Sequence, residues 1–256
     1  MHPCKPTSAG VSLLLCRFIQ LGKHQIPERF GTTAVQICQF VISTDERGGH
    51  VNPAVTAVLY ILGKISFTHS LLYCVAQTLG AAVGAALSYI VYVEAINDFD
   101  GGTRSVFGTN TSTGMIFASF PGPHLSNTGA FIDQMAGTGL LGLFVAFFCE
   151  QRNQIPSYLQ PSFFGMIAAM VGVSYSMNMG SPINPASDLG PRIFGAMFGY
   201  GMEMFTYQNY FFWVPVVAPL VGAVIGAYSY VIFIGLHIPE PAQPHIESNE
   251  ELKPLS

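Results

Sequence analysis

Charged residues are scarce in this chain of 256 residues, of which only 9% are Asp, Glu, Lys or Arg. Soluble domains carry roughly a quarter of charged residues, so this chain has too few to cover a water-facing surface. Half of its residues are hydrophobic, and the mean hydropathy is positive. We therefore expect an all-α membrane protein rather than a soluble one.

The sequence also lacks the patterns of several other protein classes. A net charge of −4 leaves no basic stripe to neutralise phosphates, which argues against nucleic acid as a partner. The five cysteines show no Cys-X-X-Cys or other metal spacing, and there is no Ser/His/Asp set or phosphate-binding loop. We expect no metal, no cofactor and no enzymatic activity.

Long uncharged segments mark where the chain crosses the bilayer. A spanning helix needs about 20 apolar residues. Four segments are long enough, at 67–93, 129–149, 160–180 and 210–236. Two further apolar segments, 51–62 and 184–198, are too short to span.

Both short segments begin with the same tripeptide, Asn-Pro-Ala. The residues are Asn52, Pro53 and Ala54 in the first copy, and Asn184, Pro185 and Ala186 in the second. Asn favours the cap of a helix and Pro its first position. A short helix at membrane depth is tolerated only if it lines a cavity or is buried in protein. Because residues 76–85 also match 218–227, we predict an inverted repeat with two re-entrant half-helices.

Two half-helices that meet at the midplane would form a selective pore. Each N-terminus carries unpaired N–H groups and a partial positive charge, which repels cations. The side chains of Asn52 and Asn184 could donate hydrogen bonds to a neutral solute there.

With these motifs the chain resembles the aquaporin (major intrinsic protein) family. Residues 48–56 match its first signature loop and residues 184–192 its second. Asp188 and Gly172 resemble the aquaglyceroporin branch. The resemblance implies a passive channel for glycerol, water and small neutral solutes such as urea. It also implies a plasma-membrane location and assembly as a homotetramer, or as a hetero-oligomer with related channels.

One departure from the family lies in the selectivity filter, which the resemblance places at Gly172, Ser181 and Ser187. Ser187 stands where the family almost always has Arg. Because Ser brings one hydroxyl and no charge, we expect a wider filter with weaker ion exclusion. The alternative is that Arg192 or a loop residue supplies the charge.

Two other positions carry expectations of their own. The resemblance implies that Gln134 replaces a buried acidic group that holds the loop of the second half-helix. Asn110 begins the sequon Asn-Thr-Ser, which makes it a candidate glycosylation site in a loop on the outer side.

A second departure lies near the N-terminus. Only 24 positions separate Glu28, in a segment like the family's first-helix signature, from Asn52. That interval is too short for the remaining spans, so the first repeat reads as incomplete. We therefore divide the chain into a divergent region with a remnant of the first helices (1–47), a channel domain (48–239) and a disordered cytoplasmic tail (240–256).

The shortened first repeat leaves a second function open. The chain could be a non-conducting subunit that interacts with full-length aquaglyceroporins. An ion-coupled transporter is disfavoured, because Asp133 is the one Asp, Glu, Lys or Arg within the expected spans.

Overall fold

The structure is a computed structural model that describes residues 50–180 and 183–239. Every regular element in these residues is helical, which confirms the all-α prediction. The predicted N-terminal remnant (1–47), the filter residue Ser181 and the tail (240–256) lie outside them. The longer helices are α4 (Phe67–Asp100), α5 (Asn127–Cys149), α6 (Gln160–Ser174) and α9 (Val214–Phe233), and the shorter ones are α3 (Pro53–Ile61), α7 (Pro185–Gly195) and α8 (Glu203–Tyr210).

Short helical turns join these helices. Between α4 and α5 lies the 3₁₀ turn η1 (Gly114–Ile116). The connections around α6, α8 and the end of the chain contain η2 (Gln151–Asn153), η3 (Ser157–Leu159), η5 (Phe211–Trp213) and η6 (Gly235–His237), and a π turn, η4 (Ala196–Tyr200), follows α7.

Three helical stretches are long and apolar enough to cross a membrane: Phe67–Asp100, Asn127–Cys149 and Glu203–His237. The segment 160–180, expected to be a span, differs. Its helix α6 has 15 residues, or about 22 Å, against a hydrocarbon core of about 30 Å. It ends at Ser174 because the following residues form turns, with Gly180 at a φ of 77°.

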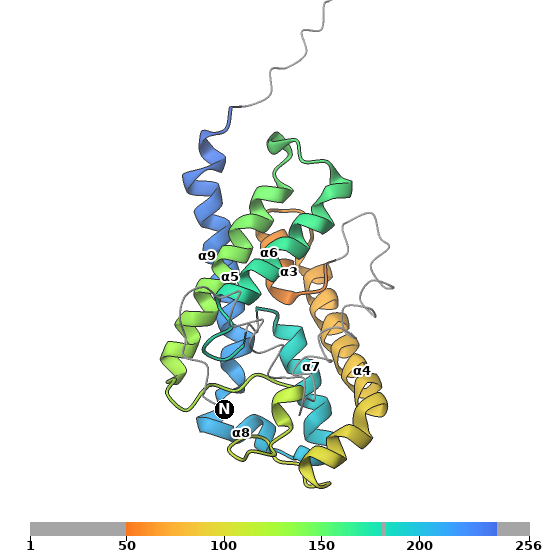
Figure 1. The fold of residues 1–256 in the computed structure, drawn as a ribbon. Helices are drawn as coiled ribbons and strands as arrows, with labels where there is room; N and C mark the ends of the chain where they lie inside the picture. Colours follow the sequence, from red (N-terminus) through yellow and green to blue (C-terminus); the bar gives the residue numbers. More distant parts are fainter. Residues whose placement is uncertain (1–49, 181–182, 240–256) are drawn as a thin grey trace, which may run out of the picture.

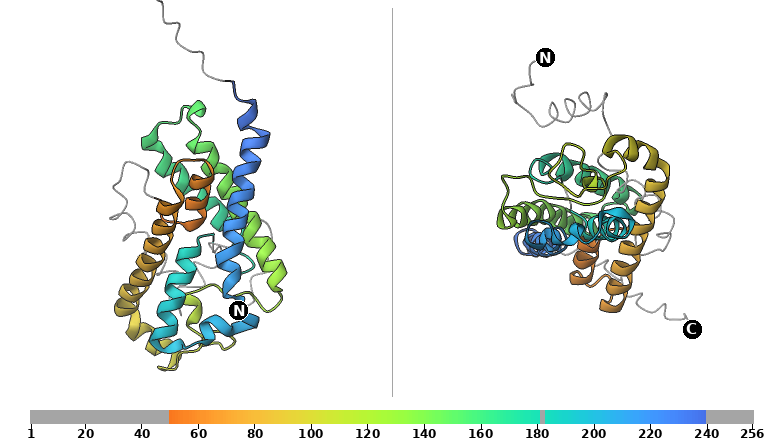
Figure 2. Two further views of the ribbon diagram at one scale, coloured as in Figure 1. Left: turned by 180° about the vertical axis from the view of Figure 1, so that it is seen from behind. Right: turned by 90° about the horizontal axis from the view of Figure 1, so that it is seen from below.

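The two short helices occupy the middle of the molecule. Figure 1 shows α3 and α7 one above the other, with α5 and α9 on one side and α4 on the other, and Figure 2 shows the same order from behind. Helix α3 contacts α4, α5 and α9, while α7 contacts α4 and α9. Both short helices are therefore enclosed by longer ones, as helices too short to span must be.

Helices α5 and α9 pack closely because glycines face one another across their contact. A Cβ at Gly222 would overlap the backbone oxygen of Met135, and one at Gly226 would overlap that of Gly139. A Cβ at Gly142 would likewise overlap Ala223. Small residues let helix backbones approach closely inside membranes, so these glycines set the distance between the two helices.

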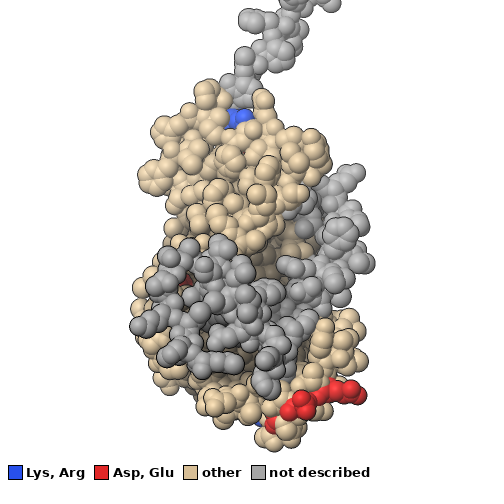
Figure 3. Space-filling model, in the orientation of Figure 1, with Lys and Arg blue, Asp and Glu red and all other residues tan. Residues whose placement is uncertain are grey.

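Helix α4 is more exposed than the helices beside it. It extends seven residues beyond its expected end at position 93, to Asp100. Its exposed large apolar side chains are Phe67, Leu71, Leu72, Val75, Leu79, Val83, Leu87, Ile90 and Val91. In Figure 3 the charged side chains appear chiefly at the two ends of the face in view. Both features suit a helix that contacts lipid.

Candidate pore site

Asn52 caps the N-terminus of α3. Its backbone is extended, with a φ of −142°, and Pro53 follows as the first helical residue. The side-chain oxygen Oδ1 accepts from the backbone N–H of Ala54 at 2.8 Å. One of the unpaired donors at this helix start is thus satisfied locally.

Asn184 caps α7 in the same way. Its φ is −133°, and Pro185 is the first helical residue. Its Oδ1 accepts from the N–H groups of Ala186 at 3.0 Å and Ser187 at 3.4 Å. The two Asn-Pro-Ala copies therefore have matching local structures, as expected for a repeat.

The two caps also bind each other's chain. Asn52 Nδ2 donates to the carbonyl of Ile183 at 2.9 Å, and Asn184 Nδ2 donates to the carbonyl of Val51 at 3.0 Å. These reciprocal bonds bring the two helix starts together. Each amide NH₂ has two donors, and these bonds use one of each pair. At this junction two partial positive charges meet beside two asparagine amides.

Family comparison decides what this junction belongs to. A family model described as major intrinsic protein matches residues 22–230. The chain belongs to this family. This membership confirms the resemblance in the motifs and makes the chain a multi-pass integral membrane protein of a channel family.

Individual relatives agree with the family match. Human aquaporin-9 is 41% identical over 208 residues, which cover 81% of this chain and 70% of that protein. Human aquaporin-10 is 38% identical over 215 residues, covering 84% and 71%. The X-ray structure of the aquaglyceroporin from Plasmodium falciparum matches with a TM-score of 0.66 and 28% identity, covering 81% of this chain and 88% of that one.

In this major intrinsic protein, neutral hydrogen bonds support the first short helix. Gln77 of α4 donates through Nε2 to the carbonyl of His50 at 2.8 Å and to Thr56 Oγ1 at 3.1 Å. Thr56 Oγ1 also lies 2.9 Å from His50 Nδ1. Gln77 and Thr56 are buried, so this network fixes α3 against α4. The sequence analysis missed Gln77, which has no signal apart from being polar in an apolar span.

A buried ion pair supports the second short helix. Asp188 Oδ1 accepts from Arg192 Nε at 2.8 Å, and both side chains are 1% exposed. The other carboxylate oxygen, Oδ2, accepts from the backbone N–H of Ser119 at 2.7 Å. Arg192 donates further to the carbonyls of Ser119 at 2.8 Å and Met204 at 2.6 Å. Asp188 and Arg192 thus join α7 to the α4–α5 connection and to α8.

This arrangement answers one alternative from the sequence. Arg192 was a candidate to supply the filter charge in place of Ser187, and that alternative is wrong. Its guanidinium is buried, bonded to Asp188 and two carbonyls, and lies 4.8 Å from the centre of the Phe120 ring. The i, i+4 spacing of Asp188 and Arg192 on a helix could have predicted their pairing.

Two of the three expected filter residues are described. Ser187 is half-buried, and its hydroxyl donates back to the carbonyl of Asn184 at 2.9 Å. Gly172 is also half-buried, and no atom of the described residues lies within 4 Å of where its Cβ would be. Ser187 therefore brings no charge, and Gly172 leaves open space beside it in α6.

Gln134 makes different contacts from those expected. Its Nε2 donates to the neighbouring carboxylate of Asp133 at 2.7 Å, and its buried Oε1 has no hydrogen-bond partner among the described residues. Asp133 instead reaches the loop before the second Asn-Pro-Ala copy, accepting from Asn178 Nδ2 at 2.6 Å. The sequence analysis missed Asn178, because a single polar residue in a turn carries no signal of its own.

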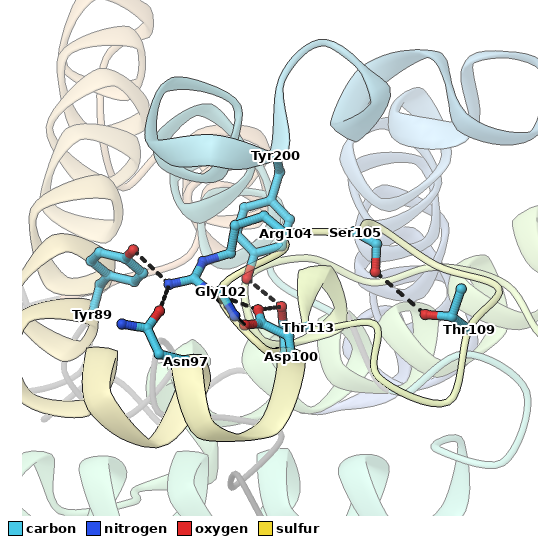
Figure 4. A network of polar contacts seen from close by, with 9 residues as sticks. All are labelled: Tyr89, Asn97, Asp100, Gly102, Arg104, Ser105, Thr109, Thr113 and Tyr200. Carbon is cyan, nitrogen blue, oxygen red and sulfur yellow. Dashed lines mark hydrogen bonds and ion pairs between the residues drawn. The ribbon is translucent and has the colours of Figure 1, made fainter.

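A further polar network joins the end of α4 to the residues after α7 (Figure 4). Arg104 forms an ion pair with Asp100 at 2.7 Å and donates to the hydroxyl of Tyr89 at 2.9 Å. Thr113 donates to Asp100 at 2.9 Å and accepts from the Tyr200 hydroxyl at 2.8 Å. Burial raises the pKa of Tyr200 to about 12, so its phenol stays protonated at neutral pH. The network fixes the connection that also contains Ser119.

Proposed function

We propose that this chain is a passive channel for glycerol and water, with other small neutral solutes such as urea passing as well. The reciprocal bonds between the two Asn caps carry the proposal. They leave amide donors beside two positive helix ends, an arrangement that favours neutral hydrogen-bonding solutes over cations. The aquaglyceroporin among the matching structures supports this choice of solutes.

The filter supports a wide channel. Gly172 brings no side chain and Ser187 no charge, while Arg192 is held by Asp188. A pore without the filter cation should pass larger neutral solutes and exclude ions less strongly, since the helix ends then supply the main positive field.

Flux through the purified chain in liposomes tests the proposal. The glycerol flux should rise linearly with the gradient, without saturation, and should be insensitive to ion gradients. A flux that saturates or follows an ion gradient would indicate a carrier instead. If the chain conducts no solute alone but still assembles with a full-length relative, the result would favour its role as a non-conducting subunit.

The variant Ser187→Arg tests the filter itself. It should lower both urea flux and proton or cation current, and Ser187→Met should lower urea flux without restoring ion exclusion. Ser and Met are both uncharged, so the pair separates charge from size. If Ser187→Arg changes neither quantity, the filter does not include this residue.

Location and assembly complete the proposal. We place the chain in the plasma membrane as a homotetramer or as a hetero-oligomer with related channels. Asn110 is exposed in the α4–α5 connection, which we place on the outer side. A mobility shift on glycosidase treatment, lost in Asn110→Gln, would support that side, whereas an unglycosylated chain from a secretory host would count against it.

A further inference from the structure

A largely buried guanidinium lies at the end of the molecule that we place outside. Arg104 Nη1 donates to both carboxylate oxygens of Asp100, each at 2.7 Å, and Nη2 donates to Tyr89 at 2.9 Å and to Asn97 at 2.6 Å. The side chains of Arg104 and Asp100 are 9% and 0% exposed. Figure 4 shows Arg104 between these partners. Because hydrogen bonds from a charged donor are short and strong, the pair has a well-defined geometry.

Asp100 joins three segments of the chain. Besides Arg104, it accepts from the N–H of Gly102 at 2.9 Å and from Thr113 at 2.9 Å, and Thr113 accepts from the hydroxyl of Tyr200 at 2.8 Å. Asp100 ends α4, Thr113 precedes η1 in the α4–α5 connection, and Tyr200 ends η4, which follows α7. This network therefore ties α4, in the first repeat, to the turn after α7, in the second.

The stem of Arg104 also packs against η4. Gly199 has a φ of 107°, a conformation that residues other than glycine rarely adopt. A Cβ at Gly199 would lie 3.0 Å from Arg104 Cγ. The chain thus turns closely over the arginine stem after it leaves α7, and Arg104 contacts η4 directly as well as through Thr113.

The α4–α5 connection extends this network to α7 itself. The N–H of Gly114 donates to the carbonyl of Ser105 at 3.1 Å, and a Cβ at Gly114 would overlap the backbone of Val106. The chain therefore crosses itself tightly at this point. Five residues later, the N–H of Ser119 donates to Asp188 of α7 at 2.7 Å. The connection is a short and closely packed link between the Arg104 network and the first turn of α7.

We infer that Arg104 is a positioning residue for ion exclusion. By fixing the α4–α5 connection and η4 it holds α7 in line with α3, so that both helix starts direct their positive ends at the junction of the two Asn caps. Loss of the network lets α7 tilt. The tilt weakens the field against cations more than it impedes a neutral solute, because the field of a helix end depends on the direction of the helix. This inference rests on the proposed channel function.

Relative permeation gives the first test, with the full chain in liposomes and both rates normalised per channel. Arg104→Met should raise the ratio of proton current to glycerol flux by about threefold or more. Thr113→Val is a milder variant that removes only the hydroxyl between Asp100 and Tyr200, and it should raise the ratio in the same direction. A parental ratio in both variants, whether or not their stability falls, would overturn the inference.

A double variant separates lost positioning from an unpaired charge. Asp100→Asn combined with Arg104→Met removes both charges, so it should be more stable than Arg104→Met alone. It still lacks the bonds from Arg104 to Tyr89 and Asn97, and its ratio should stay as high as that of Arg104→Met. A parental ratio in the double variant would show that the unpaired carboxylate had raised the proton current, and it would overturn the inference.

Arg152→Met is the matched control at the other end of the molecule. Arg152 forms an ion pair with Glu150 at 2.8 Å and donates to the carbonyls of Gly235 and Ile238, near the end of α9 rather than α7. This variant should keep the parental ratio. A ratio raised as much as in Arg104→Met would overturn the inference, because the loss of any ion pair would then have the same effect.

Hydrogen exchange tests the positioning without any flux. Arg104→Met should speed deuterium uptake in residues 113–120 and 196–204 and leave α3 unchanged, while Arg152→Met should leave all three segments unchanged. Unchanged uptake at 113–120 and 196–204 would overturn the positioning role even in a conducting channel. If the parent chain conducts no glycerol but the variant shows the expected change in uptake, the channel function is refuted and the hold of Arg104 on the surroundings of α7 remains.

Discussion

Helices α4 and α9 follow the first and second Asn-Pro-Ala helices and carry the matching segments 76–85 and 218–227, yet their surroundings differ. Gly222 of α9 faces the backbone of α5 so closely that a Cβ would overlap Met135. Gly80, which matches Gly222 in the repeat, has no atom of another described element within 4 Å of where its Cβ would be. Among the described residues, a similar Gly/Ala-rich sequence thus packs tightly against a neighbouring helix in one repeat and has no such neighbour in the other.

The supports of the two short helices differ as well. Neutral bonds from Gln77 to His50 and Thr56 hold α3, whereas the buried ion pair of Asp188 and Arg192 holds α7. A broken buried ion pair leaves an unpaired charge, which costs more than a lost neutral hydrogen bond. The second repeat should therefore be the more sensitive one to substitution.

The largest effect is expected for Arg192→Met. It leaves the buried carboxylate of Asp188 without its partner, and we expect a loss of about 3–5 kcal/mol in stability. Arg192→Lys keeps the positive charge but cannot make the three hydrogen bonds of the guanidinium, so it should lose less stability than Arg192→Met. Thermal unfolding in detergent measures both. Equal losses for Met and Lys would show that the geometry, rather than the charge, decides.

The next effect separates Gly222 from Gly80. Gly222→Val forces a branched side chain into the backbone of α5, which costs about 1–3 kcal/mol or more. Gly80→Val meets no neighbouring helix among the described residues and should stay within about 0.5 kcal/mol of the parent. The comparison is read from melting temperatures of the two variants side by side. Similar destabilisation of both would mean that α4 is packed as closely as α9.

A smaller effect is expected at the first support. Gln77→Leu leaves the carbonyl of His50 and the hydroxyl of Thr56 without this donor, at a cost of about 1–3 kcal/mol. The exposed Gln151, changed to Leu, serves as the control and should change stability by less than about 0.5 kcal/mol. If Gln77→Leu costs as much as Arg192→Met, the difference between the supports is refuted.

The smallest effect concerns the end of α9, where Arg152 donates to the carbonyls of Gly235 and Ile238 and pairs with Glu150 at 2.8 Å. Hydrogen bonding from Arg152 lowers the pKa of Glu150 below its usual value. The stabilisation is therefore present above the ordinary carboxyl pKa and lost as pH falls through the lowered one. Glu150→Gln should remove this part of the acid dependence, worth less than about 1 kcal/mol, in melting curves from pH 6 to pH 3. An unchanged slope would contradict the assignment.

The sequence predicted the class of fold and the central motif well, because both rest on strong local signals. Low charge and long apolar runs indicate membrane helices, and Asn before Pro indicates a helix cap, as Asn52 and Asn184 show. The paired copies also suggested that the two caps belong together. In the structure the two caps are joined by the hydrogen bonds from Asn184 to the carbonyl of Val51 and from Asn52 to the carbonyl of Ile183.

Other features could not be predicted, because they depend on residues far apart in the chain. Asn178 meets Asp133 across 45 positions and Ser119 meets Asp188 across 69, and neither pairing leaves a trace in local sequence. The end of α6 at Ser174 was missed for another reason. Residues 175–180 are uncharged like the helix before them, so the absence of charge alone extends the expected span to 180.

The reciprocal bonds of the asparagine caps also bear on how the protein is made. The carbonyl of Val51 accepts a hydrogen bond from Asn184, which is synthesised 133 positions later. At ribosomal rates of about 5–20 residues per second, that is a delay on the order of ten seconds. During this time Asn52 can cap α3, but the N-terminus of α7 has not yet been made. The central junction thus closes only after Asn184 has been made, before the contacts of α9 complete the structure around it, and a chain released before Asn184 cannot form it.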